Sequence, residues 1–299
     1  GTLYLLPEDT PSRIFVFDNL QLANLNRPAR EQWLRDLGFG TPTGLPYPVE
    51  ATGVLPSPRR WDSMTPASLA MGYALNVTPL QLATAYAAIA NGGELLEPAI
   101  VQEIRTPDGE VRYRHERRVV RRVMSEASAR AVREMLRGVV ETGTAAGSNL
   151  STFDIAGKTG TAKRAVGGRY VAGKYTASFV GMFPADNPQL VILVKLDDPT
   201  KSIYGGKAAA PVSKAVLQAA LAARNAALDR RTLAANPARV REHGPVATVV
   251  GTAPVAAPVA APVVEPAAVG SASWVARLDE PRESAVATVV VVARRAVPN

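Results

Sequence analysis

Three consecutive strand patterns between residues 153 and 196 limit the fold more than any other feature of this chain. They run from Phe153 to Lys163, from Thr176 to Phe183 and from Leu190 to Leu196. The first alternates with a period of two, as side chains do on the two faces of a strand. Residues 184–188, which contain two prolines and an Asp-Asn pair, are typical of a loop that closes a hairpin between the last two. We therefore expect an antiparallel sheet.

Helix signals lie on both sides of these strands. Thr78 is a predicted N-cap, with Pro79 at the first helical position and Gln81 three residues after the cap. Ser125 is a second predicted N-cap. A helix over Glu31 to Leu37, another over Pro211 to Ala227 and a hairpin over Pro98 to Arg122 are also predicted. Helices before and after a run of hairpins indicate an α+β fold in which helices cover the faces of a sheet.

Composition excludes several kinds of site. The 299 residues include no cysteine, so disulfides and thiolate metal sites are excluded, and the two histidines give little support to a Ser-His-Asp triad. If a serine acts as nucleophile here, we expect its base to be a lysine. The chain has no run of about eighteen apolar residues and no signal-peptide pattern.

The basic character of the chain is spread along its length. A formal charge of +8 suits acidic partners, but the densest arginine cluster brackets His115 and Glu116 and has few aromatic residues on which bases could stack. We interpret this cluster as a solvated face and expect no nucleic-acid partner. Its members are Arg112, Arg114, Arg117, Arg118, Arg121 and Arg122.

The segment Gly157-Lys158-Thr159-Gly160-Thr161-Ala162 lies on the first strand pattern and carries the strongest chemical signal. A lysine beside two hydroxyls can bind a carboxylate through charge-assisted hydrogen bonds, and a free backbone N–H after Gly160 can stabilise an oxyanion. Gly160 has no side chain, and we expect the strand backbone to approach a ligand closely at this position. A P-loop is excluded, because Thr152 stands where that motif requires glycine.

Several segments together resemble a known family, and their order and spacing match it as well. From about residue 30 to residue 222 the chain is similar to the transpeptidase domain of class B penicillin-binding proteins. The resemblance rests on residues 37–44, 71–83, 90–93, 157–162 and 204–206, which read LGFGTPTG, MGYALNVTPLQLA, ANGG, GKTGTA and YGG.

The resemblance implies a penicillin-binding-protein and serine β-lactamase-like fold, an antiparallel sheet with helices on both faces. It also implies peptidoglycan D,D-transpeptidation. In that reaction a serine attacks a D-Ala-D-Ala stem peptide, releases D-Ala and passes the acyl group to an amine, and β-lactams acylate the same serine. By position, Lys158 and Thr159 would bind the carboxylate of the substrate and assist proton transfer. The Thr161 N–H would form half of the oxyanion hole, beside Gly160. No cofactor and no metal are implied.

Two motifs of the family are missing from the sequence. No serine is followed by Lys three residues later or by Asn two residues later, and Ile14 stands where the Asn of Ser-x-Asn would be expected after Ser12. We therefore expect a fragment, truncated at its N-terminus, of an enzyme that is inactive as this chain because the nucleophile is not present. Ser178 is interpreted as a sheet residue, and Lys195, Asp197 and Asp198 as a strand end and a turn.

The expected organisation has four parts. Residues 1–29 match the family poorly, residues 30–228 form the C-terminal part of the transpeptidase domain, residues 229–273 form an Ala/Pro/Val-rich linker that we expect to be disordered, and residues 274–299 form a tail of unassigned role. In the linker, Pro254, Pro258, Pro262 and Pro266 repeat every four residues, which breaks both helices and sheet ladders.

The resemblance also predicts location and partners. We expect a periplasmic or other extracytoplasmic place in the cell envelope, with the parent protein held at the inner membrane only through a missing N-terminal anchor. The expected partners are stem peptides, β-lactams and proteins of division or elongation. Two alternatives stay open: a relative of serine β-lactamases or D,D-carboxypeptidases, which use water as acceptor, and a non-catalytic scaffold of the cell envelope.

Overall fold

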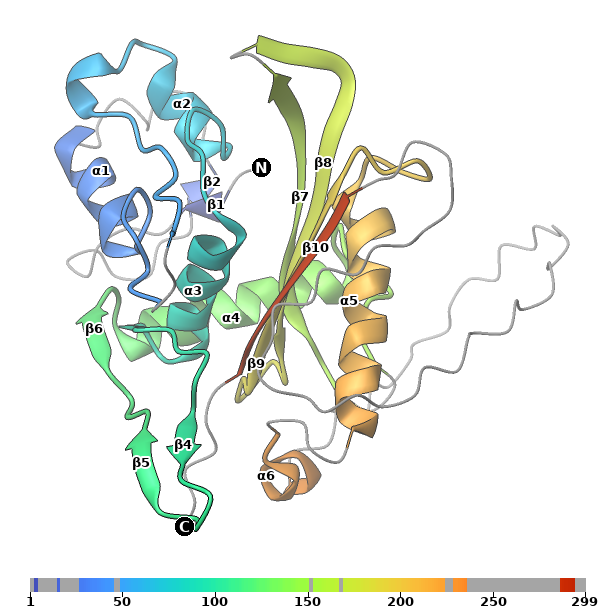
Figure 1. The fold of residues 1–299 in the computed structure, drawn as a ribbon. Helices are drawn as coiled ribbons and strands as arrows, with labels where there is room; N and C mark the ends of the chain where they lie inside the picture. The colour runs from blue at the N-terminus through green and yellow to red at the C-terminus, as the bar shows by residue number, and fades with distance from the viewer. Residues whose placement is uncertain are drawn as a thin grey trace, which may run out of the picture.

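A four-stranded antiparallel sheet forms the centre of the molecule (Figure 1). The computed structural model describes residues 3–4, 15–16, 27–45, 49–150, 153–166, 169–223, 228–235 and 286–293. The strand order is β10-β9-β8-β7, so β7 and β10 lie at the two edges. The strands are β7 (Ala156–Val166), β8 (Arg169–Phe183), β9 (Leu190–Asp197) and β10 (Val286–Ala293).

The three strands predicted from the sequence are confirmed, and β8 begins earlier than expected. It starts at Arg169 instead of Thr176, because β7 and β8 continue beyond Lys163 into a hairpin in which Val166 pairs with Arg169. The pairing register shifts between Lys163 and Ala165, which marks a bulge in this edge. From Thr176 to Phe183, β8 pairs with β9 without any shift.

Helices cover both faces of the sheet, as predicted. α3 (Pro79–Ala90) begins with a complete capping box, in which the Thr78 hydroxyl accepts from the Gln81 N–H and the Gln81 side chain accepts from the Thr78 N–H. α4 (Glu126–Glu141) is capped by the Ser125 side chain. Both lie against the face of the sheet opposite that covered by α5 (Gly205–Ala222) (Figure 1).

The start of α5 differs from the prediction. Pro211 was expected at the first helical position, but it lies inside a helix that begins at Gly205. A proline inside a helix removes one N–H and leaves the carbonyl four residues earlier without its partner. That carbonyl belongs to Lys207, which is exposed like Pro211, so water can satisfy it. The predicted end at Ala227 falls among residues outside the described part of the chain.

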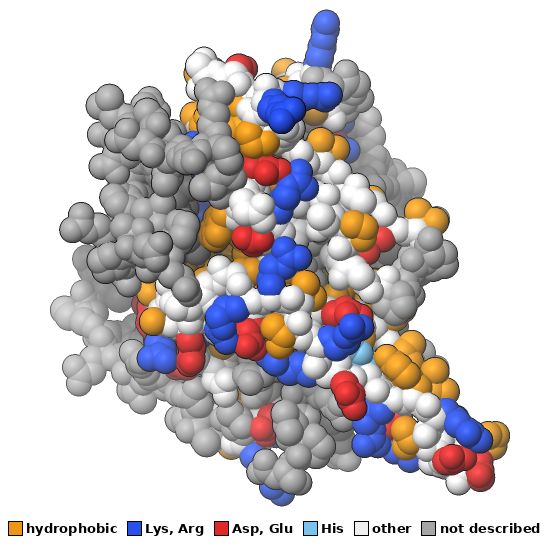
Figure 2. Space-filling model, turned by 90° about the vertical axis from the view of Figure 1, so that its left-hand side faces the viewer, with side chains coloured by type: hydrophobic (Ala, Val, Ile, Leu, Met, Phe, Trp, Pro, Cys, Tyr) orange, Lys and Arg blue, Asp and Glu red, His pale blue; other side chains and the backbone are white. Residues whose placement is uncertain are grey.

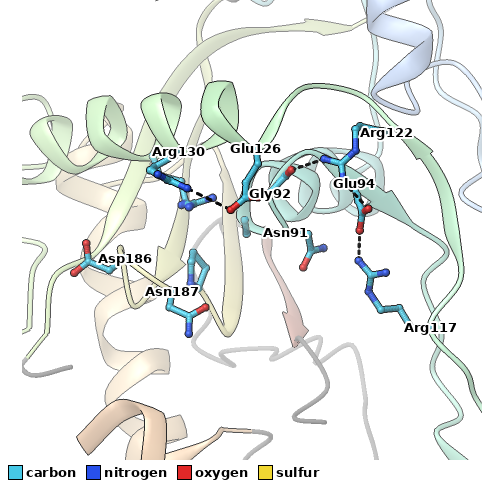
Figure 3. A pocket seen from close by; sticks show the side chains of 12 residues that line it. Asn91, Gly92, Glu94, Arg117, Arg122, Glu126, Arg130, Asp186 and Asn187 are labelled. Atoms are coloured by element: carbon cyan, nitrogen blue, oxygen red, sulfur yellow. Dashed lines mark hydrogen bonds and ion pairs between the residues drawn. The ribbon is translucent and has the colours of Figure 1, made fainter. Parts of the chain in front are cut away.

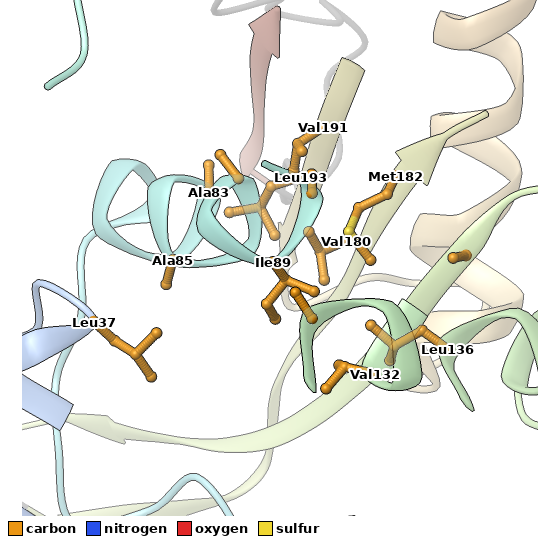
Figure 4. Packing of buried hydrophobic residues seen from close by; sticks show 14 of the residues in the cluster. Leu37, Ala83, Ala85, Ile89, Val132, Leu136, Val180, Met182, Val191 and Leu193 are labelled. Atoms are coloured by element: carbon orange, nitrogen blue, oxygen red, sulfur yellow. The ribbon is translucent and has the colours of Figure 1, made fainter. Parts of the chain in front are cut away.

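Alternate residues of the central strands feed two hydrophobic cores. Val180 and Met182 of β8 face the core formed with α3 and α4, together with Val191 and Leu193 of β9 (Figure 4). Phe179 of β8 instead belongs to a second core on the α5 side of the sheet. This core also contains Ile192 and Val194 of β9 and Ala209 and Leu217 of α5. Because successive side chains point to opposite faces and helices cover each face, β8 and β9 are buried on both sides.

A helical subdomain and a projecting hairpin complete the described part of the chain (Figure 1). α1 (Arg27–Asp36) ends before a turn whose Gly38 and Gly40 adopt positive φ, which confirms the predicted stop. η2 (Pro58–Arg60) and α2 (Thr65–Ala70) follow it. The two-residue strands β1 (Leu3–Tyr4) and β2 (Phe15–Val16) pair with each other.

The hairpin predicted over Pro98 to Arg122 is only partly correct. β4 (Glu103–Arg105) and β5 (Val111–Arg114) do pair around the predicted turn. β6 (Val119–Arg122) instead pairs with β3 (Glu94–Leu96), which directly follows the glycine stop of α3. The arginine cluster is therefore divided between two small sheets.

Two elements lie beyond α5. α6 (Arg230–Ala235) occurs where the linker was expected to begin, and β10 joins the central sheet from the segment expected to be a tail. The proline repeat at residues 254–266 lies outside the described residues. Within the described ranges, no helix has the length and hydrophobicity needed to cross a membrane.

Candidate functional site on the β7 edge

Lys158, Thr159, Gly160 and Thr161 lie on β7, one of the two outer strands of the central sheet. They pair with Val180, Phe179, Ser178 and Ala177 of β8. Lys158 and Gly160 therefore share one face of the strand, and Thr159 and Thr161 share the other. On its other side β7 is paired with no described strand. A row of backbone donors and acceptors is thus available at this edge.

Two contacts show which backbone groups point to the open edge of β7. The Lys163 N–H donates to the Tyr73 hydroxyl at 3.2 Å, and the Thr159 carbonyl accepts from Lys158 Nζ at 2.8 Å. Every second residue of a strand directs its N–H and C=O to the same side, so Thr161, between them, directs both groups outward. The oxyanion donor expected from the sequence therefore faces the open edge.

The Lys158 ammonium is held close to this edge. Its side chain is exposed at the surface, yet nearby atoms remove part of the water around it, and this desolvation lowers the pKa of Lys158. Its resolved hydrogen bond is to a neutral carbonyl, which leaves two ammonium protons available for an anion. A lysine that binds a ligand carboxylate must have ammonium protons available for it, and Lys158 meets this requirement.

The two hydroxyls of the site are tied to separate elements. Thr159 Oγ1 lies 2.7 Å from Thr144 Oγ1, in the turn that follows α4. Thr161 Oγ1 accepts at 3.3 Å from the N–H of Gly205, the first residue of α5. The segment containing residues 204–206, singled out in the sequence, is thereby brought to the back of the β7 strand.

The ligand-approach role expected for Gly160 stays a prediction, and packing gives a second reason for a glycine there. A Cβ at Gly160 would collide with Ser178 Oγ across the β7–β8 pair, and a Cβ at Gly205 would collide with the carbonyl oxygens of Ser178 and Gly160. Gly205 is therefore required by packing of α5 against the β7 and β8 backbones, whereas at Gly160 the collision is with a side-chain hydroxyl that can rotate. Ser178 is a residue of the inner strand β8 opposite Gly160, as its interpretation as a sheet residue predicted.

Sequence reasoning missed Tyr73 and Thr144. Tyr73 stacks edge-on against Tyr170 of β8, with ring centroids 5.6 Å apart, and caps the Lys163 N–H. It precedes Ala74, whose φ of 63° is unusual for a residue other than glycine. Tyr73 lies within a segment that had been recognised, but nothing in the sequence distinguished its hydroxyl. No sequence pattern marked Thr144 as a residue of the site.

The predicted strand end near Lys195 is confirmed. β9 ends at Asp197, and Asp198 follows with a φ of 52°. Lys195 pairs with Asp197, while Arg164 of β7 pairs with Asp198. Burial and hydrogen bonds act in opposite directions on the Asp197 carboxyl, and the bonds from Lys195 and Thr176 leave its pKa lowered. These charges compensate one another and fix the ends of the strands.

A cavity of about 480 Å³ lies away from Lys158, between the end of α3, the start of α4 and the β8–β9 loop (Figure 3). Its arginines are partly neutralised: Arg117 and Arg122 share Glu94, Arg130 pairs with Glu126, and Arg133 donates to the Ile89 carbonyl. None of the four β7 residues lines this cavity.

The arginine cluster is compensated in the same way. Blue and red side chains alternate over this face of the molecule and along the projecting hairpin (Figure 2). Each arginine of the cluster has a carboxylate partner; the pairs are Arg112–Glu110, Arg114–Glu103, Arg117–Glu94, Arg118–Glu97, Arg121–Asp36 and Arg122–Glu94. This is the solvated face that the sequence predicted.

Comparison with known proteins agrees with the resemblance seen in the sequence. The profile of the penicillin binding protein transpeptidase domain matches residues 11–218, a range that begins within the segment 1–29 that was expected to match poorly. The probable peptidoglycan D,D-transpeptidase PenA of Neisseria flavescens is 37% identical over 188 residues, which cover 62% of this chain and 44% of PenA. PbpB of Mycobacterium tuberculosis is 37% identical over 190 residues, which cover 60% of this chain and 28% of PbpB.

A solved structure is similar as well. Penicillin-binding protein 3 of Mycobacterium tuberculosis, in complex with aztreonam, superposes with a TM-score of 0.60 at 33% identity, over 66% of this chain and 47% of that protein. The chain thus spans less than half of the length of these relatives. Because the family profile covers more than half of the sequence and the fold agrees, the chain belongs to the penicillin-binding protein transpeptidase domain family.

Proposed function

We propose that the β7 edge forms the carboxylate-binding and oxyanion-stabilising wall of a peptidoglycan D,D-transpeptidase. The single observation that carries this proposal is the outward direction of the Thr161 backbone N–H, next to a Lys158 ammonium that has no carboxylate partner among the described residues. A terminal carboxylate and a carbonyl oxygen of one peptide need these two kinds of donor.

Each residue would have a separate task. Lys158 would bind the C-terminal carboxylate of a D-Ala-D-Ala stem peptide, or the carboxylate of a β-lactam, and would help to transfer protons. The Thr159 hydroxyl, held by Thr144, would add a hydrogen bond to the same carboxylate. Thr161 would donate its N–H to the oxyanion that develops when a serine attacks the peptide carbonyl. Gly160 would let the strand pass close to the ligand while accommodating Ser178 on its other side.

In the reaction we propose, a serine forms an acyl-enzyme, D-Ala leaves, and an amine of a neighbouring stem accepts the acyl group. No serine of this sequence stands in a Ser-x-x-Lys motif, so none is assigned as the nucleophile. We further infer an extracytoplasmic location, in the periplasm where the envelope has one, and partners among proteins of division or elongation. The family and the peptidoglycan-related names of the relatives support the location, whereas the partners rest on the resemblance alone.

A binding experiment separates this proposal from a purely structural role. An N-acylated D-Ala-D-Ala dipeptide is titrated into the ¹⁵N-labelled chain, and amide shifts are followed by NMR. We expect the Thr161 amide to shift, and Lys158→Met to abolish that shift. Lys163→Met, five residues along the same strand, serves as the matched control and should retain it. Unchanged Thr161 shifts at saturating peptide, or equal effects of the two variants, would refute the proposal.

A further inference from the structure

The outer strand β10 presents a long edge that no described strand covers. β10 pairs with β9 through eight consecutive residues, Val286 with Asp197 through Ala293 with Leu190, without a register shift. Within the described residues it has no partner on its other side. Half of its backbone N–H and C=O groups therefore point away from the sheet.

The two edges of the sheet differ in how they are protected. On β7 a bulge follows Lys163, lysines stand at positions 158 and 163, and the Tyr73 hydroxyl caps a backbone N–H. Charges, bulges and caps of this kind keep edge strands from pairing with other chains. β10 has none of them: its sequence, Val-Ala-Thr-Val-Val-Val-Val-Ala, contains no charge, no proline and no glycine, and it is rich in β-branched residues.

The hydrogen-bond pattern of the sheet shows which β10 residues point outward. Lys163 directs its N–H away from β8, and the Asp198 N–H donates to the Tyr175 carbonyl at 2.8 Å. Hydrogen-bonded and non-hydrogen-bonded residue pairs alternate along antiparallel strands, and neither the β8–β9 nor the β9–β10 pairing contains a register shift. Counting along these pairings makes Val194 and Val289 a pair that is not hydrogen-bonded. The Val289 N–H therefore points to the open edge, and the Val290 N–H points to β9.

We propose that this edge is an interface at which β10 pairs antiparallel with β10 of a second copy of the chain. A two-fold axis at Val289 places Val289 opposite itself and Ala287 opposite Val291, so that outward-pointing groups meet one another. The strand is uncharged, so its own copy meets no repulsion.

The interface would join two sheets into one that is continuous across the dimer. It uses the edge opposite β7, so both carboxylate sites would stay open to solvent. The proposal is therefore independent of the function assigned to the β7 edge.

Sedimentation velocity of the full 299-residue chain over a concentration series tests the interface, with two adjacent proline variants. The wild-type chain is expected to be a dimer that dissociates on dilution. Val289→Pro removes an outward N–H and should leave a monomer that melts at the temperature of the wild-type chain when the latter is diluted enough to be monomeric. Val290→Pro removes an N–H bound to β9 and should lower the melting temperature. A wild-type chain that stays monomeric at every concentration, or a Val289→Pro variant that dimerises like wild type, would overturn the proposal.

An engineered disulfide excludes exchange of β10 between copies. The 299 residues include no cysteine, so Ile192→Cys with Val291→Cys links β9 to its β10 partner, and in the proposed dimer Val291 faces Ala287 of the second copy rather than another cysteine. A monomer-sized band on a non-reducing gel is expected, because each β10 stays on its own sheet. A band of dimer size would mean that the strands are exchanged, and would replace edge pairing as the mode of association.

Discussion

The hydroxyls of Thr144 and Thr159 lie 2.7 Å apart and connect the turn after α4 to the site strand β7. A threonine side chain on an edge strand is otherwise free to rotate, so this bond orients the Thr159 hydroxyl before any ligand arrives. Preorganisation of this kind reduces the entropic cost of binding.

Thr144→Val should weaken the affinity for a D-Ala-D-Ala dipeptide by about 1 kcal/mol, the usual net value of one hydrogen bond. The valine keeps the shape of the threonine and removes only its hydroxyl. The dissociation constant from the NMR titration measures the effect. Thr142→Val, two residues earlier on an exposed site whose hydroxyl contacts the Gly138 carbonyl, is the control and should bind like wild type.

Lys158 should make both ligand binding and stability depend on alkaline pH. Desolvation lowers its pKa, so the folded chain releases this proton at a lower pH than the unfolded chain, whose lysine titrates near 10.5. Between the folded-state and unfolded-state pKa values of Lys158, the unfolded chain binds more protons than the folded chain. The free energy of unfolding should therefore rise with pH over this interval. The affinity for a carboxylate should fall over the same interval.

Lys158→Met should remove the part of the pH dependence of stability that Lys158 causes. At neutral pH the variant should be at least as stable as wild type, because it no longer contains a partly desolvated charge. Urea unfolding at a series of pH values checks this, with Lys201→Met at an exposed position as control. A variant less stable than wild type at neutral pH would contradict the assigned cause of the pKa shift.

Two helical glycines should respond in opposite ways to alanine. A Cβ at Gly205 would collide with the backbone oxygens of Ser178 and Gly160, whereas a Cβ at Gly138 in α4 meets nothing within 4 Å. Gly205→Ala should therefore cost about 1–3 kcal/mol through overpacking. Gly138→Ala should stabilise the fold by about 0.5–1 kcal/mol, because alanine is the better helix former. Thermal unfolding of both variants measures the difference.

A fluorescent penicillin should bind this chain without labelling it covalently. The carboxylate donors of β7 are present, but no serine has the Lys that the family's nucleophile requires three residues later. A denaturing gel after incubation should show no fluorescent band, with a complete penicillin-binding protein as the positive control. Labelling at any serine of the 299 residues would refute the expected inactivity.

The parts of the fold that the sequence predicts are those governed by local chemistry. The caps Thr78 and Ser125 select their helices through bonds made within four residues, and the strands follow a period of two. The start of α5 was placed wrongly because it depends on how closely Gly205 approaches β8, a tertiary contact. The role of β10 was missed because its partner β9 precedes it by about ninety residues, and no local pattern records such a pairing.

The candidate site divides in the same way. Lys158 and Thr161 could be predicted as site residues because a lysine, hydroxyls and a glycine stand together on one strand. Tyr73 and Thr144 reach that strand from positions 90 residues before Lys163 and 15 residues before Thr159. A hydroxyl brought in from so far along the chain leaves no spacing that a sequence could reveal.

Gln81, in the first turn of α3, should be highly sensitive to substitution. It is fully buried, and its side-chain amide donates to the carbonyls of Thr41 and Thr52 at 2.7 and 2.8 Å while its oxygen accepts from the Thr78 N–H. One side chain therefore both caps α3 and holds the connection between α1 and η2. Gln81→Leu removes all three hydrogen bonds, which should cost about 2–4 kcal/mol at about 0.5–1.5 kcal/mol for each bond, and water can reach the freed carbonyls of the exposed residues Thr41 and Thr52.

Gln81→Glu tests the same contacts by charge. The glutamate can still accept from Thr78, but when ionised it cannot donate to the two carbonyls and it places a charge in a buried site. The variant should therefore be less stable than Gln81→Leu at neutral pH. Its stability relative to wild type should improve as pH falls and the carboxyl gains a proton that it can donate. Urea unfolding at neutral and mildly acidic pH measures this, and equal losses at both pH values would mean that the amide donors do not hold the connection between α1 and η2.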